Sequence, residues 1–114
     1  MIVENKNLTM VRGDTENLYI TVKNYEYHSG DSVKLTVRDY QKAFTGKLVA
    51  GDNVQFTKTG TIANGICTIK ILPTDTKTLA ADTYCYDIQL TTSGGDIHTI
   101  VPIHYFTLVS EVTK

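Results

Sequence analysis

Hydrophobic and polar residues alternate with a period of two along most of the chain. In the segment ENLYITVK, Leu18, Ile20 and Val22 alternate with Tyr, Thr and Lys, and the segment SVKLTVR repeats the pattern. Successive side chains of a strand point to opposite faces of a sheet, so each run predicts a strand with one buried face and one wet face. Such half-buried strands are typical of antiparallel sheets.

Turn-forming residues separate these runs. Asn64-Gly65 favours a tight hairpin, because both residues tolerate a positive φ angle. The Gly-Asp-Asn run at 51–53 and the Ser-Gly-Gly-Asp run at 93–96 indicate further turns. The pattern predicts about seven or eight short strands. They are expected at about residues 6–12, 16–23, 32–39, 47–50, 53–59, 61–71, 83–92 and 96–109, and the stretch 61–71 can be broken at its Asn-Gly turn.

One segment, LPTDTKTLAAD at residues 72–82, breaks the alternation. Thr74 is a candidate N-cap and Asp75 lies in the first turn, where both can satisfy amides that a helix start leaves free. We therefore predict a short helical turn near residues 74–80, which crosses from one sheet to the other with Leu79 towards the core. Many short strands with turns at this spacing predict a two-sheet β-sandwich.

Length and composition fit a single folded domain over residues 1–114. Hydrophobic residues make up 41% of the chain and charged residues 20%, which is ordinary for a globular protein. The 11 basic and 12 acidic residues give a net charge of −1 without a Lys/Arg stripe, so a nucleic-acid partner is not expected. The apolar stretches are too short for a signal peptide or a membrane span, so we expect no membrane partner and synthesis in a cytoplasm.

The two cysteines are predicted to face opposite ways. Cys67 shares a strand face with Ile69 and Ile71, which places it towards the core, whereas Cys85 shares a face with Asp87 and Gln89, which places it outward. Two such cysteines cannot reach the short Cβ separation of a disulfide, so free thiols are expected.

Residues with catalytic or metal-binding chemistry are dispersed. His28, His98 and His104 lack partners at ligand spacing, and neither cysteine has a neighbouring base in the sequence. The Asp residues lie mostly in turns, where Asp usually accepts hydrogen bonds from nearby amides. We therefore expect no catalytic residues, no cofactor and no metal site, and an enzyme is the least favoured class.

Tyrosine is frequent, with 7 residues, and its positions fall into two groups. Tyr84 and Tyr86 are predicted core residues, and Tyr84, which follows the segment LAADT, resembles the tyrosine corner of Greek-key sandwiches. Tyr25, Tyr27 and Tyr40 lie in loop-like stretches, where tyrosines suit contacts with protein or sugar and also occur as scattered surface aromatics.

Pro102 interrupts the last apolar run. Proline cannot donate to a strand ladder, so it marks an edge position or a bulge in the final strand. Together with His104, this irregular strand is a candidate interface.

The triplet Arg12-Gly13-Asp14 has the composition of an integrin ligand, but it lies between two alternating runs. Gly13 can take the positive φ of a tight connection, and Asp14 can cap the free amides of the turn. Arg12 is expected on the sheet face or paired with an acid. The triplet is therefore predicted to be a structural turn rather than a receptor ligand.

Four segments together resemble a family of small proteins and domains from phages and prophages of Gram-positive bacteria. They are LTMVRGDTENLYITV, GDSVKLTVRD, ILPTDTKTLAADTYCYDIQLTTSGGDIHTI and YFTLVSEVT. The family is similar to the N-terminal domain of the baseplate upper protein, a component of the tail tip. The most specific parts are residues 12–15 and 84–90. The family usually has Gly where Asp82 stands, so the turn before Tyr84 is expected to differ in shape.

The resemblance implies an immunoglobulin-like antiparallel β-sandwich that serves as a structural domain of a phage tail or baseplate. It implies docking to neighbouring tail subunits without catalysis, assembly as a homo-oligomer, and a place in the virion tail after assembly in the bacterial cytoplasm. The alternative is a sugar- or receptor-binding module of a phage or bacterial surface protein.

Overall fold

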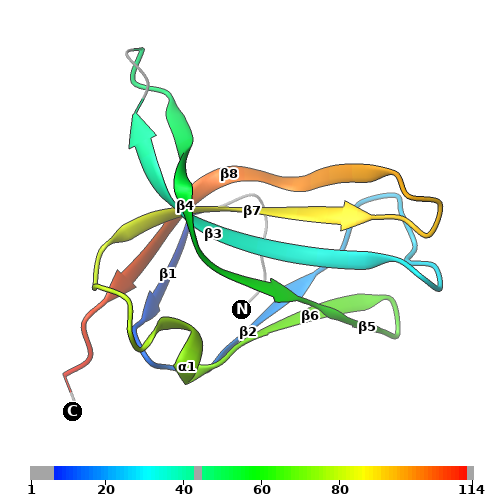
Figure 1. Ribbon diagram of the computed structural model, residues 1–114. Helices are drawn as coiled ribbons and strands as arrows, with labels where there is room; N and C mark the ends of the chain where they lie inside the picture. Colours follow the sequence, from blue (N-terminus) through cyan, green and yellow to red (C-terminus); the bar gives the residue numbers. More distant parts are fainter. Residues whose placement is uncertain (1–6, 43–44, 113–114) are drawn as a thin grey trace.

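The computed structural model describes residues 7–42 and 45–112, which form two sheets (Figure 1). The larger sheet has five strands in the order β1-β8-β7-β3-β4, and the smaller has three in the order β2-β6-β5. The strands and the helix are β1 Leu8–Val11, β2 Glu16–Ile20, β3 Ser32–Lys42, β4 Leu48–Thr59, β5 Thr61–Ala63, β6 Ile66–Ile71, α1 Pro73–Thr76, β7 Thr83–Thr91 and β8 Ile97–Val109.

The predicted all-β, immunoglobulin-like sandwich is confirmed by the strand order. In a variable-type immunoglobulin sandwich, strands G, F, C and C′ form one sheet and strands B, E and D lie in the other. Here β8-β7-β3-β4 and β2-β6-β5 occupy those positions. All the pairings are antiparallel except that of β1 with β8, which is parallel and joins the first and last strands of the chain.

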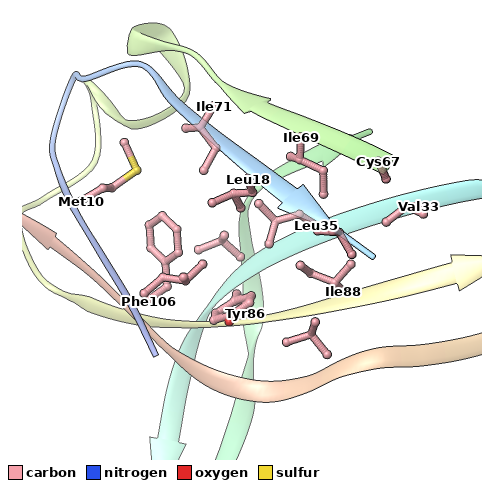
Figure 2. Packing of buried hydrophobic residues seen from close by; sticks show 14 of the residues in the cluster. Met10, Leu18, Val33, Leu35, Cys67, Ile69, Ile71, Tyr86, Ile88 and Phe106 are labelled. Atoms are coloured by element: carbon pink, nitrogen blue, oxygen red, sulfur yellow. The ribbon is translucent and has the colours of Figure 1, made fainter. Parts of the chain in front are cut away.

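The core lies between the two sheets, where every second residue of most strands is buried. Figure 2 shows Leu18 and Ile69 of the smaller sheet pointing towards Leu35 and Ile88 of the larger one. Each of these four side chains is fully enclosed. The period of two in the sequence therefore marks the inner face, as predicted.

The strand predicted at 47–50 and the strand predicted at 53–59 are one strand, β4. The turn expected at 51–53 is wrong, because the segment forms an irregularity within the β3–β4 ladder. Asp39 of β3 accepts the backbone N–H of Asn53 at 2.9 Å. A Cβ at Gly51 would fall against the same carboxylate, so the glycine lets the strands approach instead of reversing the chain.

Turn chemistry predicts the other connections more closely. Asn64 and Gly65 both have positive φ angles and divide 61–71 into β5 and β6, as the sequence allows. The run at 93–96 joins β7 to β8, where the Thr92 amide donates to the Asp96 carbonyl at 2.8 Å. β2 ends at Ile20, three residues before its predicted end.

The helical turn between β6 and β7 crosses from the smaller sheet to the larger, as predicted, but it is shorter than the expected 74–80. α1 covers Pro73–Thr76 and its N-cap is Leu72, so the prediction of Thr74 as N-cap is wrong. Asp75 accepts the Leu72 backbone N–H at 2.7 Å and satisfies the start of the helix from inside the first turn. Leu79 packs against the core, as expected.

The bulge predicted at Pro102 is confirmed in β8. Tyr86 is paired with His104 but Ile88 with Val101, so three residue steps on β8 face two on β7. The additional residue moves the alternation of β8 out of phase, which explains the irregular apolar run around Pro102.

Candidate functional site

The Arg-Gly-Asp triplet links β1 of the larger sheet to β2 of the smaller. Gly13 has a φ of 84°, in the region that favours glycine. The Arg12 amide donates to the Val109 carbonyl at 2.9 Å, and the Asp14 amide donates to the Val11 carbonyl at 3.2 Å. The turn is therefore tied to the end of β8, and Asp14 itself is exposed.

The Arg12 side chain is used inside the fold. Its Nη2 donates to Glu111 Oε1 at 2.7 Å, its Nε donates to Glu111 Oε2 at 3.3 Å, and its Nη1 donates to the Leu79 carbonyl at 3.2 Å. The hydrogen bonds to Glu111 raise the pKa of Arg12 above its usual value. The Gly13 amide donates to the hydroxyl of buried Thr76 at 2.9 Å. The Arg12 guanidinium and the Gly13 amide therefore hold the segments that contain Glu111, Leu79 and Thr76. The triplet connects parts of the fold and is not displayed as a ligand.

The two strand tyrosines at the start of β7 both lie in the core. Tyr84 donates its hydroxyl to the Ala80 carbonyl at 2.8 Å, which is the backward hydrogen bond that a tyrosine corner makes. Tyr86 is 1% exposed, and burial raises its pKa to about 12. Its ring packs edge-on against Phe106, with 6.2 Å between ring centroids. These residues fix the start of β7.

Pro102 and His104 lie on the bulged part of β8. The Pro102 carbonyl lies 2.7 Å from His104 Nδ1, and because a carbonyl only accepts, this nitrogen carries the proton. β1 pairs with β8 only from Phe106 onward. Before that point β7 is the described strand that pairs with β8, and the Tyr105 amide donates to the Asn7 side-chain oxygen at 3.0 Å.

The two cysteines lie in different sheets, and both are free. Cys67, on β6 of the smaller sheet, faces the core, whereas Cys85, on β7 of the larger sheet, faces away from it. Cys67 is part of the core cluster, and burial raises its pKa to about 11. Cys85 is outside that cluster but is 2% exposed. Its Sγ donates to the Asp39 carbonyl at 3.3 Å, so the neighbouring strand covers it. The predicted orientations agree with this arrangement, whereas the burial of the outward cysteine comes from the irregular β3.

The remaining ionisable residues do not gather into a metal site. In residues 7–42 and 45–112, no three His, Cys, Asp or Glu side chains lie close enough to share a metal ion. The same residues contain no helix with the length and apolar character to cross a membrane.

The outer face of the larger sheet carries a cross-strand row from four strands. Val54, Arg38, Cys85 and Tyr105 lie directly opposite one another in register, on β4, β3, β7 and β8. Val54 is 48% exposed, and Tyr105 meets Tyr40 edge-on with 5.4 Å between ring centroids. Arginine, tyrosine and an exposed aliphatic side chain thus lie together on one surface, which we call the outer face.

A small cavity of about 110 Å³ opens on this outer face. Asp87 and Arg38 line it with the buried Cys85. Burial raises the pKa of Asp87, while the Arg38 charge opposes that shift. Arg38 also reaches the Gly51 carbonyl at 3.4 Å, which ties the face to β4.

β4 forms one edge of the larger sheet. It has 12 residues and pairs with β3, and no other described strand pairs with it. Val49 and Val54 are exposed along it. Figure 1 shows the end of the β3–β4 hairpin projecting beyond the two layers. Edge and outer face together form a continuous candidate contact region.

The sequence pattern did not identify Tyr105 as an outward residue, because the alternation of hydrophobic and polar residues is irregular in that part of β8. Its face follows from the hairpin register, because it lies opposite Cys85, whose outward face the sequence did predict. The orientation of Tyr105 could therefore have been predicted from its cross-strand partner, but not from the residues next to it in the sequence.

Comparisons with known proteins add no family. No family model and no curated protein sequence matches the chain. Among solved structures, the chain is similar to a structure of murine CRIg at 15% identity, over 93% of this chain and 92% of that one, with a TM-score of 0.36. A likeness of this size carries no functional argument, and the fold rests on the strand order described above.

Proposed function

We propose that the chain is a structural domain of a phage or prophage tail baseplate that docks to neighbouring tail subunits and performs no catalysis. The observation that carries the docking role is the continuity of the outer face with the unpaired edge of β4. The tail assignment is supported by the resemblance in the Arg-Gly-Asp-Thr turn at 12–15 and in residues 84–90.

Docking uses two kinds of contact. The edge of β4 offers backbone N–H and C=O groups to a partner strand, as in β-augmentation. The outer face supplies Tyr40, Tyr105 and Arg38, and tyrosine and arginine are the residue types enriched at the energetic centres of interfaces. Val54 lies where the two meet and is 48% exposed. Pro102, exposed on the neighbouring bulged part of the sheet, extends the contact region in this proposal. His104 lies opposite the core residue Tyr86, on the other face from Tyr105, and contributes only at the margin of that region.

The absence of catalysis in this proposal is supported by the state of the thiols. Burial raises the pKa of Cys67 to about 11 and raises that of Cys85. A nucleophilic cysteine needs a lowered pKa and access to solvent. Neither thiol therefore has the character of a nucleophile. The role within a tail is mechanical, and symmetric repetition of the domain in a homo-oligomer suits it.

The experiment is a binding assay with phage tail and baseplate proteins, combined with solution mass by sedimentation. Val54→Lys places a charge where edge and outer face meet and should abolish self-association and binding to the tail proteins. Val112→Lys is the matched control, because Val112 is 99% exposed and lies outside the contact region. A wild-type chain that stays monomeric at high concentration and binds no tail protein would contradict the proposal.

A further inference from the structure

We propose that the groove between the β2–β3 loop and the β5–β6 hairpin binds a neutral saccharide unit. The groove has a volume of about 430 Å³, within the range of about 300–1,000 Å³ that is usual for small-molecule sites. It lies at the end of the sandwich away from α1 and the Arg-Gly-Asp turn (Figure 1). The docking proposal uses neither this groove nor the loop tyrosines beside it.

No Lys or Arg lines the groove to pair with an anionic ligand. The ionisable base of the lining is His28, whose Nδ1 lies 3.2 Å from the Tyr25 hydroxyl and 3.8 Å from the Asp31 carboxylate. The carboxylate of the groove, Asp31, has a side chain that is 1% exposed. Asp31 accepts the Tyr25 hydroxyl at 2.6 Å, the His28 amide at 2.8 Å and the Ser93 amide at 3.1 Å. With its acceptor sites used inside the fold, this carboxylate is not presented to a ligand.

Polar groups without a full carboxylate or ammonium charge, and a limited apolar surface, are exposed to a ligand. The His28 side chain is 67% exposed, and Ser29 and Asn64 are exposed residues of the lining. They supply imidazole, hydroxyl and amide groups, which donate to and accept from hydroxyls. Tyr27 and Ile62 are half-buried residues of the same lining and add apolar surface. A sugar ring fits both kinds of surface, because its hydroxyls can bond the polar groups and its C–H faces can pack against Tyr27 and Ile62.

The walls of the groove are fixed before a ligand arrives. Tyr27 donates its hydroxyl to the Ile20 carbonyl at 2.9 Å, and its ring meets Tyr25 edge-on with 6.1 Å between centroids. The opposite wall is the tight turn at Asn64, whose φ is 53°. Binding to such a prearranged site avoids the entropy cost of ordering loops.

The test is a titration of isotope-labelled full-length chain, followed by amide chemical shifts, with glucose, galactose and N-acetylglucosamine as separate probes. The expected result is a saturable shift of the amides at 27–31 and 60–65 with at least one sugar. Asn64→Gly keeps the positive φ but removes the side-chain amide, and should weaken that binding about fivefold, the effect of losing one hydrogen bond. Ser29→Ala should act similarly.

His28→Ala should also weaken binding, whereas His98→Ala is the matched control, because His98 is an exposed histidine outside the groove lining. Glycerol 3-phosphate and trialanine serve as charged and peptide probes. The proposal is overturned if no sugar shifts the groove amides, if the shifts map elsewhere, or if only the phosphate or the peptide produces them. It stands independently of docking, since Val54→Lys should leave sugar binding unchanged.

Discussion

Arg12 and Asp31 each hold one end of the sandwich through a charged side chain whose hydrogen bonds are made inside the fold, yet the two ends differ. Arg12 joins segments distant in sequence, Glu111 and Leu79, and closes its end. Asp31 mainly holds its own loop, with Tyr25 as one partner, and leaves a groove beside it. The first arrangement serves the connection of the sheets, whereas the second keeps a loop rigid without filling the space next to it.

The largest expected effect tests how tightly the groove end joins the core. Gly60 lines the groove, and a Cβ there would fall against Cys67 Sγ and within 3.1 Å of an Ile69 carbon. Both neighbours are fully buried, so they have little room to move. Gly60→Ala should lower the free energy of unfolding by about 3 kcal/mol, at the upper end for overpacking. Urea denaturation measures the change.

Gly94→Ala is the control for that experiment. The nearest atom to its added Cβ is 3.9 Å away, so the substitution should leave stability nearly unchanged. If Gly94→Ala lowers the free energy of unfolding as much as Gly60→Ala does, the loss comes from the restricted backbone of alanine and not from contact of the new Cβ with the core.

The next effect concerns the Arg12 end. Gly13→Val forces a β-branched side chain into a φ of 84°, and it should cost about 1–2 kcal/mol of unfolding free energy. Asp14→Glu, at the exposed neighbouring position, should change the stability by less than about 0.5 kcal/mol. Thermal denaturation of both variants measures this contrast. Equal losses would show that the turn depends on the Asp14 side chain as much as on its backbone.

A smaller effect is expected at the tyrosine corner. Tyr84→Phe keeps the buried ring and removes the hydrogen bond to the Ala80 carbonyl. The expected loss is about 1 kcal/mol, the net contribution of one such hydrogen bond. Tyr40→Phe, on the outer face, is the control. A comparable loss of stability there would show that the Tyr84 hydrogen bond contributes no more than any tyrosine hydroxyl. Chemical denaturation at neutral pH distinguishes them.

The sequence predicts what local chemistry determines. The alternation of Leu18 and Ile20 identifies the inner face, Asn64-Gly65 gives a hairpin, and Pro102 gives a bulge, because each depends on neighbours in the chain. The continuity of β4 could not be predicted, since the carboxylate that takes the Asn53 amide comes from Asp39 on another strand.

The candidate sites depend still more on distant contacts. The partner of Arg12 is Glu111, at the other end of the chain, and only the folded β1–β8 pairing brings them together. The outward place of Tyr105 depends on the register with β7. The sequence placed Tyr25, Tyr27 and Tyr40 in loops, but Tyr40 lies in β3, which runs to Lys42, and the prediction of a loop there is wrong. The groove beside Tyr25 and Tyr27 forms only when two separate loops meet.

A pH-dependent effect separates the two ends. Hydrogen bonds from the His28 amide, the Tyr25 hydroxyl and the Ser93 amide lower the pKa of Asp31 below its usual 3.8. A lowered pKa in the folded state means that the charged carboxylate stabilises the fold above about pH 4, and that this contribution is lost as the pH falls through the folded value. Asp31→Asn should therefore be less stable than the wild type at pH 7, and the difference should shrink in acid.

Urea unfolding at several pH values between 7 and 3 measures this convergence. Asp96→Asn, at an exposed position in the neighbouring β7–β8 loop, is the control and should change the stability little throughout. If Asp31→Asn stays equally destabilised at every pH, the loss comes from hydrogen bonds that an amide, with one acceptor oxygen, cannot accept in place of two carboxylate oxygens, and not from the charge. The two ends would then differ in hydrogen-bond geometry and not in their dependence on charge.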